Sequence, residues 1–124
     1  GSRMIATDVC VPISRLAECI ALTQEDIARA SMPIPLFGHV GDGNFHLMIL
    51  VDPDREDDLE EAWALNTRLV RRGLAMGGTC TGEHGIGLGK REFLVEEFGA
   101  GVDVMRQIKA TLDPANLLNP GKVV

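Results

Sequence analysis

Three histidines and one glutamate are the residues of this 124-residue chain whose types and spacing point to chemistry. His39 and His46 flank the segment Gly-Asp-Gly-Asn in the stretch GHVGDGNFH, and His84 follows Glu83 in the stretch TGEHGIG. Gly, Asp and Asn between two apolar runs are typical of a β-hairpin turn. The first two histidines are therefore predicted to lie on opposite arms of one hairpin.

The register of this hairpin decides whether the two imidazoles can act together. With the turn centred on Asp42 and Gly43, His39 would lie directly opposite His46. Residues paired in this way share a face of the sheet, with Cβ atoms about 4.5–5.5 Å apart. Both rings would then reach one metal ion, in a partly dry place between apolar neighbours. Histidines that merely face each other beside the turn are the open alternative.

Glu83 and His84 offer a further metal ligand and a base. The glycines around them let a ligand approach the backbone closely, and two histidines with one carboxylate are typical of a catalytic metal site with open positions. A glycine-rich surface loop without a chemical role is the alternative. The glycine spacing fits neither a P-loop nor a dinucleotide-binding loop. Lys90 is a candidate to pair with a substrate carboxylate, or it simply begins the next helix.

Hydrophobic periodicity and turn signals predict the helices and strands that carry these residues. Strands are predicted for residues 7–13, 36–40, 45–51 and 79–81, and helices for residues 14–31, 54–76, 91–98 and 102–112. Ser14 is the expected N-cap of the first helix. This order predicts an α+β fold: a ferredoxin-like, split βαβ antiparallel sheet with helices on one face, followed by C-terminal helices and an irregular tail.

The composition limits the class of protein. The 18 acidic and 12 basic residues give a net charge of −6, which argues against a nucleic-acid partner. The apolar runs are too short to span a bilayer, and no segment resembles a secretion signal. Three cysteines without CxxC spacing predict free thiols in a reducing compartment. A cytoplasmic location is expected, with peripheral membrane attachment through partner subunits as a variant of it.

Four segments taken together carry a family resemblance. HVGDGNFH, GGTCTGEHGIGLGKREFL, VMRQIKATLDP and NPGK resemble the C-terminal part of the FAD-linked oxidases that act on 2-hydroxy acids, in the branch of D-lactate dehydrogenase (cytochrome) and the glycolate oxidase D-subunit. The resemblance implies that residues 3–124 form the C-terminal part of a cap domain for substrate and metal. Residues 1–2 are interpreted as a tag remnant, and an FAD-binding domain would precede this chain.

The resemblance also implies roles for individual residues. His39, His46 and Glu83 would bind a divalent metal (zinc, manganese or iron), and His84 would be the active-site base. FAD would be held mainly by the N-terminal domain, with Asn119 and Lys122 of the tail as weaker candidates for contacts to it. Further oxidase subunits or an electron acceptor are expected partners, and the fragment alone would be inactive.

Met48 bears on the substrate. In the relatives that oxidise 2-hydroxyglutarate an asparagine stands two residues after the second histidine, whereas this chain has Met48 there. The resemblance therefore implies a small, partly apolar substrate such as D-lactate or glycolate, which would be oxidised to the 2-oxo acid with hydride transfer to flavin.

Two other functions and one difficulty stay open at this point. The same residues would serve a self-sufficient metal-dependent hydrolase, and the fold would serve a non-catalytic ferredoxin-like dimerisation module. In a plain split βαβ topology the loop after the fourth strand lies at the opposite end of the sheet from the hairpin turn. The sequence pattern alone thus gives no reason for Glu83 to meet His39 and His46.

Overall fold

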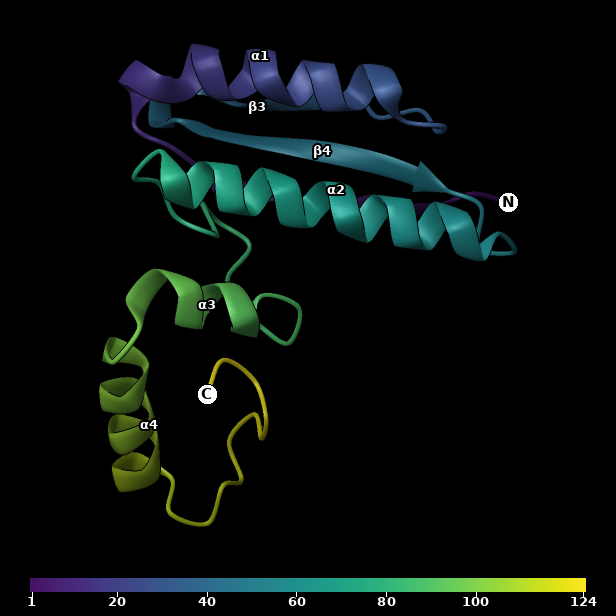
Figure 1. Ribbon diagram of the computed structural model, residues 1–124. Helices are drawn as coiled ribbons and strands as arrows, with labels where there is room; N and C mark the ends of the chain where they lie inside the picture. The colour runs from purple at the N-terminus through teal and green to yellow at the C-terminus, as the bar shows by residue number, and fades with distance from the viewer. The chain divides into compact units, whose positions relative to one another are not determined.

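The computed structural model describes residues 1–124, which divide into two compact units, Gly1–Glu83 and His84–Val124 (Figure 1). The strands of the first unit are β1 (Arg3–Ala6), β2 (Val9–Cys10), β3 (Leu36–His39) and β4 (Asn44–Val51). Its helices are α1 (Ile13–Arg29), the short 3₁₀ helix η1 (Val40–Asp42) and α2 (Glu56–Ala75). The second unit contains α3 (Arg91–Phe98) and α4 (Gly101–Leu112).

β4 is the central strand of the antiparallel sheet. It pairs with β1 and β2 along one edge and with β3 along the other. β1 and β2 keep one register against β4, so they form one strand that is interrupted at Thr7 and Asp8. Where a fourth strand was predicted, Thr79 forms only an isolated bridge to Cys10 of β2. The predicted α+β class with an antiparallel sheet is therefore confirmed.

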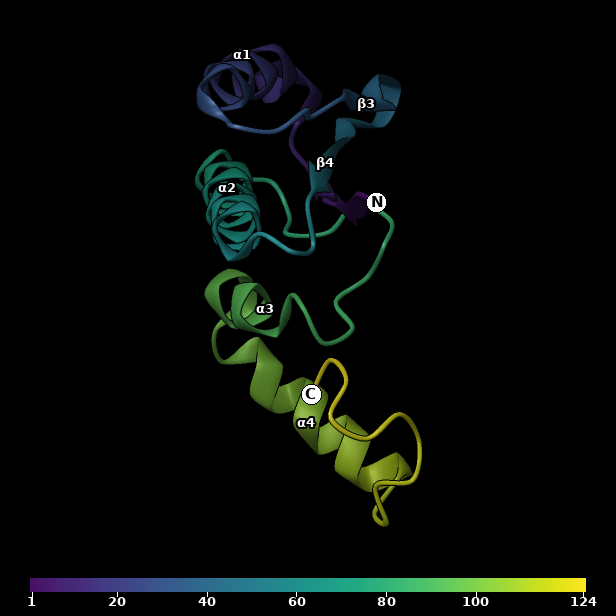
Figure 2. The same ribbon diagram turned by 90° about the vertical axis from the view of Figure 1, so that its right-hand side faces the viewer.

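The core of the first unit lies between the sheet and its two long helices. Alternate residues of β4, namely Phe45, Leu47, Ile49 and Val51, have no exposed surface. Figure 2 shows α1 and α2 on the same side of the sheet, as predicted. Because side chains alternate along a strand, the residues between these four, His46 among them, face the other side of the sheet.

The first strand and the start of α1 differ from the prediction. Pairing with β4 begins at Arg3 rather than at residue 7. The N-cap of α1 is Pro12, and Ser14 lies inside the first turn. The Arg15 amide donates to the Pro12 carbonyl at 2.7 Å. The fixed φ of proline suits the entry to a helix, so the chain turns into α1 earlier than the Ser14 signal indicates.

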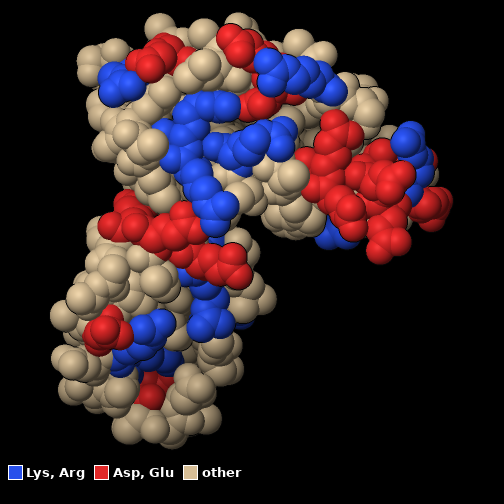
Figure 3. Space-filling model, viewed as in Figure 1, with Lys and Arg blue, Asp and Glu red and all other residues tan.

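The charged residues of α2 are arranged as the helix dipole favours, and some of them connect the helix to α1. Its first turn carries Glu56, Asp57 and Asp58, as expected at a helix N-terminus. Figure 3 shows acidic side chains gathered over this end and basic ones over the other half. There the Arg72 guanidinium donates to the Asp26 carboxylate of α1 at 2.5 Å and to the Thr23 hydroxyl at 2.9 Å.

The second unit ends in an irregular tail, as predicted, which is held by Asp113. The Asp113 carboxylate accepts hydrogen bonds from the Leu117 and Leu118 amides, both at 2.9 Å, and from the Lys109 ammonium group. These donors, Lys109 first among them, lower the pKa of Asp113 to about 2. None of the helices in either unit is long and apolar enough to cross a membrane.

Candidate metal centre

The hairpin register places the first two histidines diagonally rather than opposite each other. His39 pairs with Asn44, and His46 pairs with Phe37. The predicted direct pair is wrong because the turn is built from η1 and Gly43, which moves its centre by one residue toward the N-terminus. The partner of each histidine thus changes by two residues. Because side chains alternate between the faces with a period of two, both histidines stay on the same face of the sheet. Their ring centroids lie 6.0 Å apart, with the rings nearly perpendicular.

Gly43 is required at the end of this turn. Its φ is +76°, and a Cβ there would lie 2.0 Å from the Val11 carbonyl oxygen. Every other residue type carries a Cβ and would make this clash. The Val11 amide donates to the Gly43 carbonyl at 3.0 Å. The turn is thus fixed to the segment that precedes α1.

The backbone of the first strand orients the buried His46 ring. His46 Nδ1 lies 3.1 Å from the Thr7 carbonyl oxygen. Because a carbonyl can only accept, Nδ1 carries a proton, and Nε2 is the ring nitrogen left for a metal ion. The Leu47 amide binds the Thr7 hydroxyl at 2.9 Å instead of the Thr7 carbonyl. The interruption between β1 and β2 thereby supplies the contact that sets the tautomer of His46.

His39 is less protected than the sequence suggested. Its side chain is 63% exposed, whereas that of His46 is 5% exposed. The predicted dry environment therefore holds for His46 and is wrong for His39. The reason is that β3 is an edge strand, and Phe37 on the same face is itself half exposed.

Glu83 reaches the histidines because the fourth strand is a single bridge. Thr79 and Cys10 exchange backbone hydrogen bonds at 2.8 and 3.3 Å, and Cys10 pairs with Asn44 next to the hairpin turn. Thr79 therefore lies at the end of the sheet that carries the hairpin turn. The Gly82 and Glu83 amides then bind the Asp8 carboxylate at 2.8 and 3.1 Å. This early departure from the sheet removes the topological difficulty.

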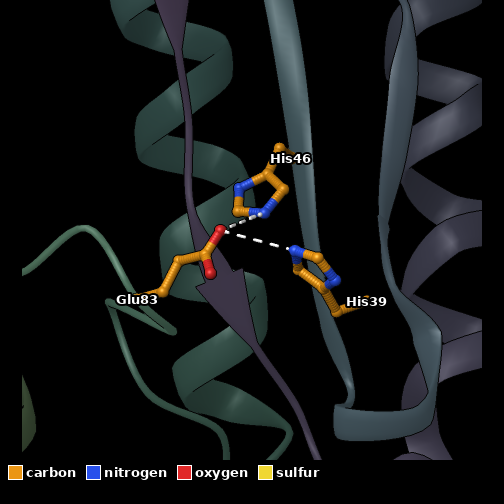
Figure 4. Close-up of side chains that lie close together, drawn as sticks. All are labelled: His39, His46 and Glu83. Atoms are coloured by element: carbon orange, nitrogen blue, oxygen red, sulfur yellow. Dashed lines mark ion pairs between the residues drawn. The ribbon is translucent and has the colours of Figure 1, made fainter.

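The three side chains form a compact group of possible metal ligands. Glu83 Oε1 lies 3.1 Å from His46 Nε2 and 3.7 Å from His39 Nε2 (Figure 4). One ligand atom from each residue lies within 4.8 Å of the others. Ligands about 2.1 Å from a tetrahedral zinc ion are about 3.4 Å apart. Separations on both sides of that value, with the Nε2 lone pair of His46 facing Glu83, fit a divalent cation.

An open pocket of about 450 Å³ adjoins these ligands. Its lining consists of Cys10, His39, Asp42, Asn44, Gly82 and Glu83. Asn44 is 5% exposed, and its carbonyl oxygen has no hydrogen-bond partner. A buried carbonyl oxygen without a partner is costly, so a ligand in this pocket would gain a polar contact. From the sequence pattern Asn44 is only a turn residue, and no local signal predicts its place at the pocket.

Cys10 lies at the pocket as a neutral thiol. Burial and the nearby carboxylates of Asp8 and Asp42 raise its pKa, and its Sγ donates to the Asp42 carbonyl at 3.2 Å. Cys10 is therefore a poor thiolate ligand and a poor nucleophile near neutral pH. All three cysteines are free thiols.

The remaining predicted residues lie at three different places. Met48 is half-buried on β4, two residues from His46 and on the same face of the sheet. His84 is the exposed first residue of the second unit. Lys90 is the N-cap of α3 in that unit. Asn119 and Lys122 lie in the exposed tail, where the Lys122 amide binds the Asn119 carbonyl at 3.2 Å.

Comparison with known proteins decides the family. The model described as "FAD linked oxidases, C-terminal domain" matches residues 1–123. The chain belongs to this family. The resemblance seen in the four sequence segments is thereby confirmed for the FAD-linked oxidase C-terminal domain as a whole.

Curated relatives of this FAD-linked oxidase domain come from the expected branch. The chain is 54% identical to the probable mitochondrial D-lactate dehydrogenase of Danio rerio over its whole length, which is 25% of that protein. It is 45% identical to the mitochondrial D-lactate dehydrogenase [cytochrome] of Arabidopsis thaliana, again over its whole length and 22% of the relative. Identity to the glycolate oxidase subunit GlcD of Bacillus subtilis is 36%, over 96% of this chain and 26% of the relative.

The domain thus spans about a quarter of the length of the relatives that it matches. Two of the three carry the word mitochondrial in their names. The cytoplasmic location expected from the sequence stays a prediction for this chain.

Proposed function

We propose that this domain is the part of an FAD-dependent oxidoreductase's cap that carries the metal ligands and the base. The enzyme would convert a small D-2-hydroxy acid, D-lactate or glycolate, to the 2-oxo acid. The observation that carries the proposal is the convergence of His39, His46 and Glu83 from two segments far apart in the sequence. The names of the relatives support the substrate class. The FAD-binding domain would be a separate part of the full-length protein.

The two histidines and the glutamate would hold a zinc, manganese or iron(II) ion through Nε2 of each ring and the carboxylate. When bound, the metal lowers the pKa of the hydroxyl of a chelating 2-hydroxy acid, and FAD accepts the hydride from its α-carbon. Thr7 contributes by holding the proton of His46 on Nδ1. The open pocket beside the ligands leaves room for the carboxylate and hydroxyl of a small acid.

His84 is the proposed base. It follows the ligand Glu83 directly in the chain, and an imidazole is well suited to take a hydroxyl proton near neutral pH. The hydroxyl proton passes to the His84 ring as the α-carbon loses hydride, which leaves the 2-oxo acid. Lys90 is a weaker candidate to pair with the substrate carboxylate, and Asn119 and Lys122 are weaker candidates for contacts to the FAD-binding domain.

Met48 is proposed to favour small substrates. Its half-buried thioether lies on the same face as His46, where an apolar side chain would disfavour a second carboxylate on the substrate. D-lactate or glycolate would fit this environment better than D-2-hydroxyglutarate.

The test is a substrate screen of the full-length protein with an artificial electron acceptor and with metal content measured on the same sample. D-lactate or glycolate should be turned over faster than L-lactate and D-2-hydroxyglutarate. His84→Ala should abolish turnover and retain the metal, whereas Glu83→Gln should lose both. Full activity of His84→Ala would refute the base assignment, and a metal-free, active protein would refute the metal site.

A further inference from the structure

Asp8 is a buried carboxylate that the proposed reaction does not use. It lies in the gap between β1 and β2 and has no exposed surface. Its oxygens accept hydrogen bonds from the Thr81 hydroxyl at 2.7 Å, the Gly82 amide at 2.8 Å and the Glu83 amide at 3.1 Å. All three donors come from a segment more than 70 residues further along the chain.

These bonds fix the backbone from which the Glu83 side chain extends. A desolvated carboxylate is costly unless donors surround it, and hydrogen bonds to a charged acceptor are stronger than those between neutral groups. The segment 81–83 is therefore pulled onto Asp8 at the point where it leaves the sheet. This contact replaces the further strand pairing that would carry Glu83 along β2 and β1, away from the hairpin.

Asp8 also faces the second ligand. Asp8 Oδ1 lies 3.7 Å from His46 Nδ1, on the side of the ring away from Glu83. The Thr7 carbonyl is the closer acceptor for Nδ1, at 3.1 Å. The Asp8 charge adds to the field that keeps the Nδ1 proton in place, so Nε2 presents its lone pair to the site.

We propose that Asp8 is a positioning residue that holds both Glu83 and His46 in the geometry for metal binding. The inference rests on the proposed metal site and adds a residue that acts from outside it. Asp8 acts through Glu83 and His46 because its contacts are to the backbone amide of Glu83 and to Nδ1 of His46, the ring nitrogen that is not the ligand atom. Substitution of a residue that holds metal ligands in place from outside the coordination sphere typically weakens metal binding about 10–100-fold.

The experiment compares Zn²⁺ affinity in the full-length protein and its Asp8→Asn variant, by competition with a chromophoric chelator. Asparagine keeps the size of the side chain and removes its charge, so Zn²⁺ binding should weaken about 10–100-fold. The absorption spectrum of bound Co²⁺, which reports coordination, should change as well. Asp58→Asn is the matched control, since Asp58 is also a buried carboxylate that accepts a backbone amide, from Asp52 at 3.1 Å. It should leave both readouts unchanged.

A second variant covers the case in which Asp8→Asn does not fold. Thr81→Val removes one donor and leaves the carboxylate, and it should weaken Zn²⁺ binding several-fold. Thr67→Val is its control, because the Thr67 hydroxyl binds only the Trp63 carbonyl within α2. Unchanged Zn²⁺ affinity in Asp8→Asn, or in Thr81→Val if the former is unfolded, would overturn the positioning role alone. Failure of the unmodified protein to bind Zn²⁺ would overturn the metal site and this inference with it.

Discussion

At the scale of single residues, the site depends on close packing between Gly82 and Asn44. A Cβ at Gly82 would lie 2.5–2.6 Å from the amide atoms of Asn44. Asn44 is almost fully buried, so it has little room to give way. The glycine before Glu83 therefore has a steric reason to be there.

Gly82→Ala should weaken Zn²⁺ binding and destabilise the first unit by about 1–3 kcal/mol, the usual cost of overpacking. Asn44 or the segment that carries Glu83 must move to accept the new methyl group. Gly41→Ala is the matched control, because a Cβ there meets nothing within 4 Å. Chemical denaturation and Zn²⁺ titration of both variants check this. Equal behaviour of the two would contradict the steric explanation.

Among the helices of the first unit, a partly buried ion pair connects α1 and α2. Arg72 and Arg68 both pair with Asp26, but their side chains are 18% and 51% exposed. Arg72 also binds Thr23. Because solvent screens exposed pairs strongly, the two arginines should contribute unequally although they share a partner.

Arg72→Ala should lower the free energy of unfolding of the first unit by about 2 kcal/mol, because it removes charge-assisted hydrogen bonds to the partly buried Asp26 carboxylate. Arg68→Ala should cost less than about 1 kcal/mol. Urea denaturation at low and high salt measures both. A larger loss in Arg68→Ala would show that burial does not set the strength of these pairs.

The tail of the second unit should depend on pH through Asp113. The folded pKa of about 2 lies below the ordinary value of 3.8, so ionised Asp113 stabilises the folded tail above pH 4. That stabilisation is lost as the pH falls from about 4 through 2. Protection of the Leu117 and Leu118 amides from hydrogen exchange should fall over this range.

Asp113→Asn should lower the same protection at pH 7 and flatten its pH dependence. Asp103→Asn is the control. Asp103 pairs with Arg106 at the exposed surface of α4, the helix whose C-cap is Asp113. The control variant should leave the tail amides unchanged. A pH dependence that survives in Asp113→Asn would assign the transition to another group.

At the scale of the whole molecule, every proposed metal ligand belongs to the first unit, Gly1–Glu83. Metal that binds only the folded state must stabilise the unit that holds its ligands. Residue-resolved hydrogen exchange therefore distinguishes specific binding from binding at scattered surface carboxylates.

Zn²⁺ at 100 times its dissociation constant should add about 2.7 kcal/mol to the stability of the first unit. The slowest-exchanging amides of β4 should report this gain. A variant with His39→Ala and Glu83→Gln should show none of it. Equal stabilisation of this variant and the unmodified protein would contradict the proposed ligand set.

Local sequence patterns were enough to predict most of the helices and strands and the side chains that carry the chemistry. The apolar run of β4, the acidic first turn of α2 and the turn residues before Asn44 are patterns that each extend over a few neighbouring residues. Local patterns therefore predicted the α+β fold, the hairpin with two histidines, and a carboxylate beside a third histidine. The family resemblance added the expectation that the first two histidines and Glu83 meet.

How these pieces come together depends on contacts between segments that are distant in the sequence. The two-residue change in hairpin register depends on how η1 and Gly43 close the turn, which periodicity does not report. The contact between Asp8 and Glu83 joins residues 75 apart in the sequence. Asn44 became a candidate only when its burial and its place at the pocket were known. Such contacts depend on which segments the sheet brings side by side, and no local pattern of residue types contains that information.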